Sequence, residues 1–567
     1  MSLSGCASFG DDGSSELPNR CINVVDQVLC ETAGQQGKYI ALSHRWLIET
    51  PSANTTRSNY NCRNRKCNHE ITCEFQLTRL FREAIELTRK LGIQYIWIDS
   101  VCIIQDDDED WQREALRMAD YYQGAWLTIA ATTTTEEGGL FQKYTSQDIP
   151  RVAKLPYRDK KGVHQGSFYL QCIGTEELSN QYEKNLASTL HRRGWVFQER
   201  LLSRRLLTLS RVGAFFNCRI GHPRFVTGEV LWRQWPRKEL DIERVREDLR
   251  SMNISSQTSI IQKWWNDVIE SYSILEITRM EGDRLMALAG LAKEFDLAFK
   301  NAHGEGSVFL SGHWFHLVHP GICESSLLWE QNDRFSSHFW RLRGIPTWSW
   351  ASIARRQPGE AMRGLAVHWR RDTYASTTKP LCIITGIAPV SVDTTDWTLT
   401  SPQLDPQLDM HDWVSEDFGS RARFAALRIK GRLQKVLIRG FFDKHSEAIA
   451  TARLTRCYDQ DRIDVWRRVA LDQSPNVVCG WASLDPSDVE QSQDLEALAL
   501  FISEVDIEVV NLKVESFGEY ATVFWVLFLV PAPGGNGEFH RLGVGRMFGD
   551  EVHCQYNSSE ETEIALV

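Results

Sequence analysis

The chain has 567 residues, of which 42% are hydrophobic and 20 are tryptophan, so it is long enough for several packed domains and does not have the composition of a disordered protein. Its formal net charge is −10, from 64 Lys and Arg against 74 Asp and Glu, and no basic block offsets this, so we expect no nucleic-acid partner. A secretory signal, an apolar run of the ~20 residues that span a bilayer and a regular cysteine framework are all missing from the pattern, which predicts a cytoplasmic protein.

Strand and helix patterns alternate in the first part of the chain. A β-prone run at 39–43 is followed by a helical period at 76–91, a second β-prone run at 94–99, a second helical period at 109–123 and a third β-prone run at 126–131. Such alternation predicts an α/β fold in which a parallel, twisted sheet is flanked by helices.

Beyond this unit the pattern changes twice. We expect an N-terminal lead-in at 1–37 (with 21–29 as a candidate strand), an α/β domain at 38–220, a mainly helical region at 221–360 and a β-rich region at 361–567. Within these regions the sequence predicts a strand at 168–172, hairpins at 206–209 with 214–218 and at 522–530 with 539–545, and short strands at 380–387, 424–427 and 436–438.

Polar and aromatic residues follow the predicted parallel strands where each strand ends. The candidates for ligand binding are Ser43, His44, Arg45, Trp46, Ser100, Cys102, Gln105 and Trp111, and Asp99 is a candidate catalytic acid. Ligands of parallel sheets bind beyond the carboxyl ends of the strands, where an Arg and a Trp could hold a phosphate and stack on a ring. The alternative is structural, with Asp99 capping a turn and Trp46 filling core.

Glu114 is the second candidate catalytic residue. It lies three residues after Trp111, on the border of the apolar stripe of the predicted helix. A carboxylate half-buried beside an indole suits a general acid or base, or a stabiliser of developing positive charge. The alternative is a surface ion pair between Glu114 and Arg117.

Three sequence blocks resemble the heterokaryon incompatibility (HET) domain of filamentous fungi. They are YIALSHRW at 39–46, WIDSVCIIQDDDEDWQREALRMADYY at 97–122 and RRGWVFQERLLSRRLL at 192–207, and the resemblance covers roughly 38–220. DRLMALAGLA at 283–292 and IPTWSWAS at 345–352 resemble segments that commonly follow this domain. The family pattern usually has glycine after the tryptophan of the first block, where this chain has Leu47.

The resemblance implies a protein of fungal non-self recognition and programmed cell death, with a protein partner and a capacity for self-association. HET domains are thought to be distant relatives of Toll/interleukin-1 receptor (TIR) domains, some of which are enzymes. One alternative is therefore an enzyme that hydrolyses the nicotinamide–ribose bond of NAD, with Glu114 as catalytic group and NAD as substrate. Another is a HET scaffold acting on a small molecule in a metabolic pathway. No cofactor is implied.

The third block places polar residues at helical spacing. Trp195, Gln198 and Glu199 would share one helix face, turned to the rim of the sheet or toward its core. A buried brace between Glu199 and Arg200 is the structural interpretation of the same residues.

Two further clusters have the chemistry of metal ligands. Low-ranking zinc candidates are Cys62, Cys67, His69 and Cys73, although their spacing matches no common finger, and His313, His316 and His319 recur at a period of three that forms no standard site. The phosphate-binding, dinucleotide-binding and hydrolase-elbow motifs are not found in the sequence, which removes the usual support for those enzyme classes.

Overall fold

The computed structural model describes most of the chain. The described residues are 14–46, 53–64, 77–132, 139–141, 152–171, 188–210, 213–218, 221–225, 254–303, 307–316, 326–331, 339–342, 345–355, 363–364, 366–369, 379–389, 425–440, 466–485, 493–506, 522–533 and 537–567. The chain divides into two compact units, Met1–Arg244 and Val245–Val567, each of which is described by itself.

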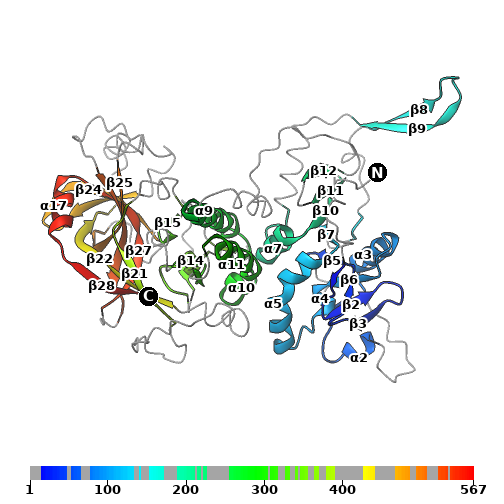
Figure 1. Ribbon diagram of the computed structural model, residues 1–567, viewed down its shortest axis with the longest axis horizontal. Helices are drawn as coiled ribbons and strands as arrows, with labels where there is room; N and C mark the ends of the chain where they lie inside the picture. The colour runs from blue at the N-terminus through cyan, green and yellow to red at the C-terminus, as the bar shows by residue number, and fades with distance from the viewer. Residues whose placement is uncertain are drawn as a thin grey trace. The chain divides into compact units, whose positions relative to one another are not determined.

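An eight-stranded sheet forms the centre of the first unit (Figure 1). Its order is β12-β11-β10-β7-β5-β6-β2-β3, with bounds β2 (Arg20–Asn23), β3 (Val28–Glu31), β5 (Tyr39–Ser43), β6 (Tyr95–Ile98), β7 (Leu127–Ala131), β10 (Arg205–Ser210), β11 (Gly213–Cys218) and β12 (Gly221–Phe225). The α/β class is confirmed, and the three predicted strands are neighbours, because β5 pairs in parallel with both β6 and β7.

The sheet as a whole is mixed. β10 extends the parallel group by pairing with β7, whereas β2–β3 and β10–β11 are antiparallel hairpins. Their short connections permit only antiparallel pairing, since a parallel crossover needs a dozen or more residues. The candidate strand at 21–29 is thus a hairpin that extends the sheet, and the predicted hairpin at 206–218 is confirmed.

Helices α3 (Arg79–Lys90), α4 (Asp99–Cys102), α5 (Asp108–Gly124) and α7 (Gly194–Leu202) belong to the same unit, and α3 and α5 confirm the two predicted helices. The side chain of Thr78 accepts a hydrogen bond from the Phe81 amide, and that of Asp107 accepts one from the Asp110 amide. Both are N-caps, and the acids of the first turn of α5 also complement the positive end of its dipole.

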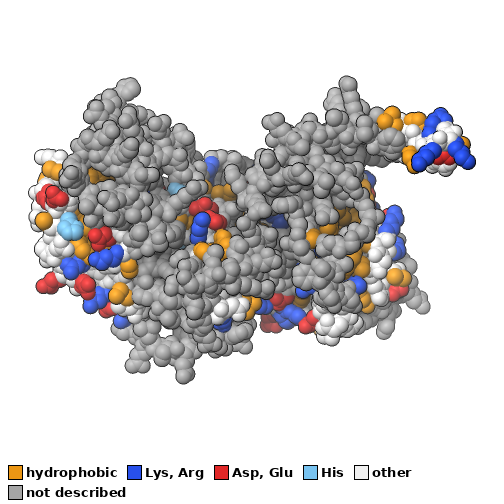
Figure 2. All heavy atoms as spheres, turned by 45° about the horizontal axis from the view of Figure 1, so that its top comes forward, with side chains coloured by type: hydrophobic (Ala, Val, Ile, Leu, Met, Phe, Trp, Pro, Cys, Tyr) orange, Lys and Arg blue, Asp and Glu red, His pale blue; other side chains and the backbone are white. Residues whose placement is uncertain are grey.

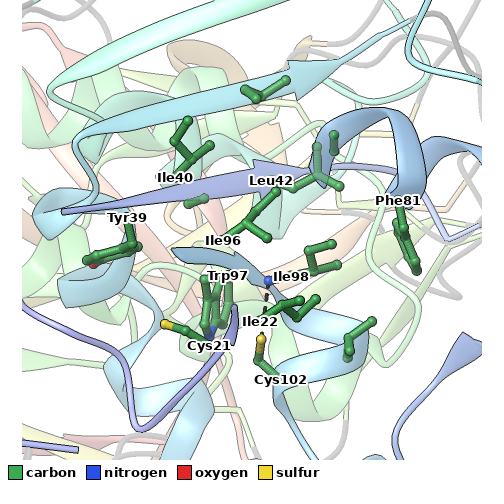
Figure 3. Close-up of a cluster of buried hydrophobic side chains, with 14 of the residues drawn as sticks. Cys21, Ile22, Tyr39, Ile40, Leu42, Phe81, Ile96, Trp97, Ile98 and Cys102 are labelled. Carbon is green, nitrogen blue, oxygen red and sulfur yellow. Dashed lines mark hydrogen bonds between the residues drawn. The ribbon is translucent and has the colours of Figure 1, made fainter. Parts of the chain in front are cut away.

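The core of this unit is built on the parallel strands. Every residue of β5 is buried, as expected for a strand that is covered on both faces. Figure 3 shows Ile40 and Leu42 beside Ile96, with Trp97 next to Cys21. The Ile98 amide donates to the Cys102 sulfur over 3.5 Å, which ties the end of β6 to the short helix α4.

Two more strands, β8 (Val152–Arg158) and β9 (His164–Gln171), form a separate two-stranded hairpin. β9 overlaps the strand that was predicted at 168–172. The small sheet β1 (Ser15–Glu16) with β4 (Gln36–Gly37) completes the described strands of the first unit.

The second unit combines helices with a nine-stranded sheet. Helices α9 (Ile254–Tyr272), α10 (Met280–Met286) and α11 (Ala289–His303) lie within 221–360, where a mainly helical region is expected, and strands occur in the same range. β26 (Thr522–Pro531) with β27 (Glu538–Phe548) confirms the predicted C-terminal hairpin. The two short strands expected at 424–427 and 436–438 are wrong as separate elements, because both lie in the 14-residue strand β22 (Ala425–Ile438). The polar residues between them pair with β25 (Leu495–Asp506) and β28 (Glu561–Leu566).

Smaller strands and helices fill out both units. They are α2 (Tyr60–Arg63), β13 (Ser307–Leu310), β14 (His313–His316), β15 (Trp329–Gln331), β16 (Phe339–Arg341), η1 (Trp350–Ser352), β17 (Ile353–Arg355), β18 (Arg363–Gly364), β19 (Val367–Trp369), β20 (Lys379–Pro380), β21 (Ile383–Pro389), β23 (Trp466–Leu471), β24 (Ser474–Leu484) and α17 (Asp550–Ser558). No helix in the described part of the chain is long and apolar enough to span a membrane.

Candidate functional site

Three predicted site residues meet at the carboxyl ends of β5 and β6. Ser43 ends β5, His44 follows it, and Asp99 follows β6, so parallel pairing brings them to the same edge of the sheet. Nδ1 of His44 lies 3.5 Å from Oδ1 of Asp99. The Trp46 indole Nε1 donates to Oδ2 of Asp99 over 3.1 Å, so one carboxylate positions both rings. Glu199 of helix α7 lies beside Ser43 and Asp99 at the same edge. We call Ser43, His44, Asp99 and Glu199 the rim cluster.

His44 is a neutral imidazole at physiological pH. Its side chain is buried, and burial lowers its pKa below the usual 6.5, against the opposing effect of Asp99. Arg193 lowers this pKa further, and its Nη1 donates to the His44 carbonyl over 3.5 Å. Nε2 of His44 has no hydrogen-bond partner among the described residues. The ring can therefore exchange a proton or accept a hydrogen bond.

Glu199 reaches this edge from helix α7. Its side chain is 4% exposed, and burial raises its pKa to about 7. The nearby Ser43 hydroxyl lowers that pKa and the charge of Asp99 raises it, while Arg193 and Tyr122 lower it. Oε2 of Glu199 makes no hydrogen bond within the described part of the chain. An acid that titrates near neutral pH, beside a neutral imidazole, is suited to general acid–base chemistry.

The sequence pattern does not single out Glu199 as a site residue, because its helical spacing fits a position at the rim as well as a brace with Arg200. Glu199 lies beside Ser43 at the end of β5. Its helix, α7, contacts α5 through Trp195, which packs edge to face against Trp111 with 6.3 Å between ring centroids. A tryptophan in each of the two helices, Trp111 and Trp195, is the sequence feature from which the packing of α7 against α5 could have been inferred.

Glu114 occupies a different setting. Its side chain is fully buried, with Oε1 accepting from Asn19 Nδ2 at 2.6 Å and Oε2 accepting from the Tyr121 hydroxyl at 2.8 Å. The surface-pair alternative is wrong, because Glu114 is buried and the Arg117 guanidinium donates to Asn19 and Glu16. Expected as half-buried beside Trp111, Glu114 instead joins the N-terminal segment to helix α5.

A buried ion pair, between Arg20 and Asp110, lies one helical turn away from Glu114. Arg20 of β2 donates to the Asp110 carboxylate and, through Nε, to the Cys102 carbonyl at 2.7 Å. Its Nη2 is also 3.8 Å from Oε1 of Glu114. Both acids of α5 therefore hold the antiparallel strand β2 in place. The raised pKa of Tyr121, caused by burial and then by Glu114, fits the same network.

The other sequence candidates have varied surroundings. Ser100 is fully buried, and its Oγ lacks a partner among the residues that the structure describes. Gln105 donates to the Asp99 and Ile103 carbonyls and so holds the loop after α4. Burial raises the pKa of Cys102 to about 12, which leaves an unreactive thiol. Arg45 is exposed beside Trp46.

The metal candidates form no described site. Cys67, His69, Cys73 and His319 lie outside the described residues, as does the side chain of His316. Where the chain is described, no group of three or more ligand residues is placed to hold a metal ion. His313 is buried, and burial lowers its pKa to about 3, which makes it a core histidine.

One protein family matches the chain. Residues 39–199 match the family described as heterokaryon incompatibility protein (HET). The match begins at the first residue of β5 and ends at Glu199, so it contains all four members of the rim cluster. No curated protein and no solved structure shows significant similarity to the chain.

Proposed function

We propose that residues 39–199 act as a HET domain that triggers programmed cell death in fungal heterokaryon incompatibility, after recognition of a non-self protein partner. The observation that supports this is the family match, whose limits coincide with β5 and Glu199. The second unit, Val245–Val567, would then sense the partner or regulate the response.

The rim cluster is the part of this domain that we expect to produce the response. Ser43, His44 and Glu199 are buried polar groups, and burying such groups costs free energy unless they are fully hydrogen-bonded. Each of the three has a side-chain atom without a hydrogen-bond partner among the described residues, which is hard to explain by folding alone. Their arrangement at the carboxyl edge of parallel strands supports a functional role.

The test is expression of the full chain in a filamentous fungus, with cell death scored by a vital dye. We expect wild type to kill the cells and Glu199→Gln, which keeps the size of the side chain and removes its charge, to kill far fewer. A matched control is Glu86→Gln, an exposed acid on α3. If wild type is harmless, the proposal of a cell-death trigger is wrong; if Glu199→Gln kills equally, the rim cluster is not responsible.

A second candidate function is hydrolysis of a small molecule at the same edge, with the nicotinamide–ribose bond of NAD as the leading substrate. The observation that favours it is the pKa of Glu199, about 7, beside the half-exposed indole of Trp46 on which a ring could stack. Purified protein incubated with NAD should release nicotinamide, and Glu199→Gln should release it at least about 100-fold more slowly, the lower end of what a general acid–base group contributes. Unchanged NAD would exclude this substrate.

A further inference from the structure

The hairpin β8–β9 is an exposed arm with its own internal order. All described side chains from Lys154 to Ser167 are exposed or half-exposed, and within the described residues its two strands pair only with each other. An isolated two-stranded hairpin has little stability in water and leaves strand edges unpaired. Such an arm is expected to gain stability when another surface covers it.

The tip of this arm is fixed by Asp159. Its carboxylate accepts from the Lys161 and Val163 amides at 2.9 Å and from Gln165 Nε2 at 3.0 Å. Gly162, at φ +81°, supplies the left-handed residue that the turn needs. The Asp159 carboxylate therefore accepts its hydrogen bonds from the hairpin itself.

The arm has a charge opposite to that of the chain. Between Lys154 and Ser167 there are four cationic side chains, Lys154, Arg158, Lys160 and Lys161, against one anionic side chain, Asp159, which is a net charge of +3. The whole chain has −10, so the remainder has −13. Figure 2 shows basic and hydrophobic side chains together on the arm. Leu155, Tyr157 and Val163 are 38%, 56% and 55% exposed.

The same chain has an exposed acidic segment at the start of α5. Asp106 and Asp107 are partly neutralised, because the Arg57 amide and guanidinium donate to them. Asp108 and Glu109, the first two residues of α5, follow them and are exposed. Two arms would repel each other through their like charges, whereas an arm and this segment attract.

We propose that the β8–β9 arm of one copy docks on the acidic start of α5 of a second copy, so that the chain self-associates head to tail. Tyr157 and Val163 supply apolar area to the contact, while Lys160 and Lys161 face Asp108 and Glu109. A contact between two different surfaces does not close on itself in a dimer and builds rings or open chains. The proposal is independent of what the rim cluster does.

Sedimentation velocity of the full-length protein over a concentration series tests this. Wild type should form oligomers at low salt that dissociate as salt screens the charges. Lys160→Glu with Lys161→Glu should weaken association about tenfold, because like charges then oppose each other. Asp108→Lys with Glu109→Lys should do the same, and mixing the two variants should restore association. The control, Lys263→Glu with Lys293→Glu, changes the net charge equally on exposed positions of α9 and α11.

Three results would overturn the proposal: wild type that stays monomeric up to about 100 µM, the range of weak complexes; a control that weakens association as much as the arm variant; or a mixture of the two variants that stays dissociated. In the monomeric case, an arm that binds anionic vesicles would identify a membrane surface as its partner instead.

Discussion

Substituting Glu114 by Gln should destabilise the first unit strongly. Both carboxylate oxygens accept hydrogen bonds, from Asn19 and Tyr121, and the side chain is fully buried. An amide of the same size can accept only through its single oxygen, so its NH₂ group would face one of these donors. Arg20, 3.8 Å away, would keep only Asp110 as an anionic neighbour.

The magnitude follows from these contacts. A buried group left unsatisfied costs about 1–3 kcal/mol, and breaking a buried charge interaction adds to that, so we expect a loss of about 2–4 kcal/mol. For a unit of this size 1 kcal/mol corresponds to about 2–4 °C, so the melting temperature should fall by roughly 4–16 °C. Scanning calorimetry of the full chain measures this. Glu86→Gln, in an exposed pair with Lys90, is the control and should not shift the transition. An unchanged melting temperature for Glu114→Gln would show that the buried contacts of Glu114 with Asn19 and Tyr121 do not stabilise the unit.

The pH dependence of stability should reveal Glu199. Its pKa is about 7 in the folded protein against 4.5 for an ordinary Glu, so the folded state holds the proton more tightly; stability should fall as pH rises from about 4.5 to 7, and Glu199→Gln should flatten that slope in denaturant titrations. Arg541→Met should lower the stability of the second unit by about 3–5 kcal/mol, because the buried guanidinium donates to Asp485 and to the Leu327 carbonyl; a smaller loss in urea unfolding would contradict this. Iodoacetamide at neutral pH should label exposed Cys554 and spare Cys102 and Cys479, whose pKa values burial raises to about 12; peptide mapping that finds Cys102 modified would show that α4 opens.

Local periodicity was sufficient to predict the elements around the parallel strands. The apolar run of β5 and the 3.6-residue period of α3 are strong signals that depend on neighbouring residues alone. Parallel pairing then follows, and with it the approach of His44 to Asp99, since strand ends of a parallel group share one edge.

Contacts between distant segments were harder to predict. Helical spacing placed Glu114 on the border of an apolar stripe, but its burial depends on Asn19, 95 residues away, which the sequence pattern does not connect to it. The position of Glu199 depends likewise on how α7 packs against α5. The sequence pattern predicts two short strands in place of β22, because the polar residues between its apolar ends find their partners in β25 and β28, which lie late in the chain.

We propose that the rim cluster, and not Glu114, produces the cell-death response expected of the first unit. The most direct measurement compares cell death caused by Glu199→Gln and Glu114→Gln at a growth temperature below the melting transition of both, with equal amounts of folded protein. We predict that Glu114→Gln still kills and that Glu199→Gln does not. Death that persists with Glu199→Gln and disappears with folded Glu114→Gln would contradict the account.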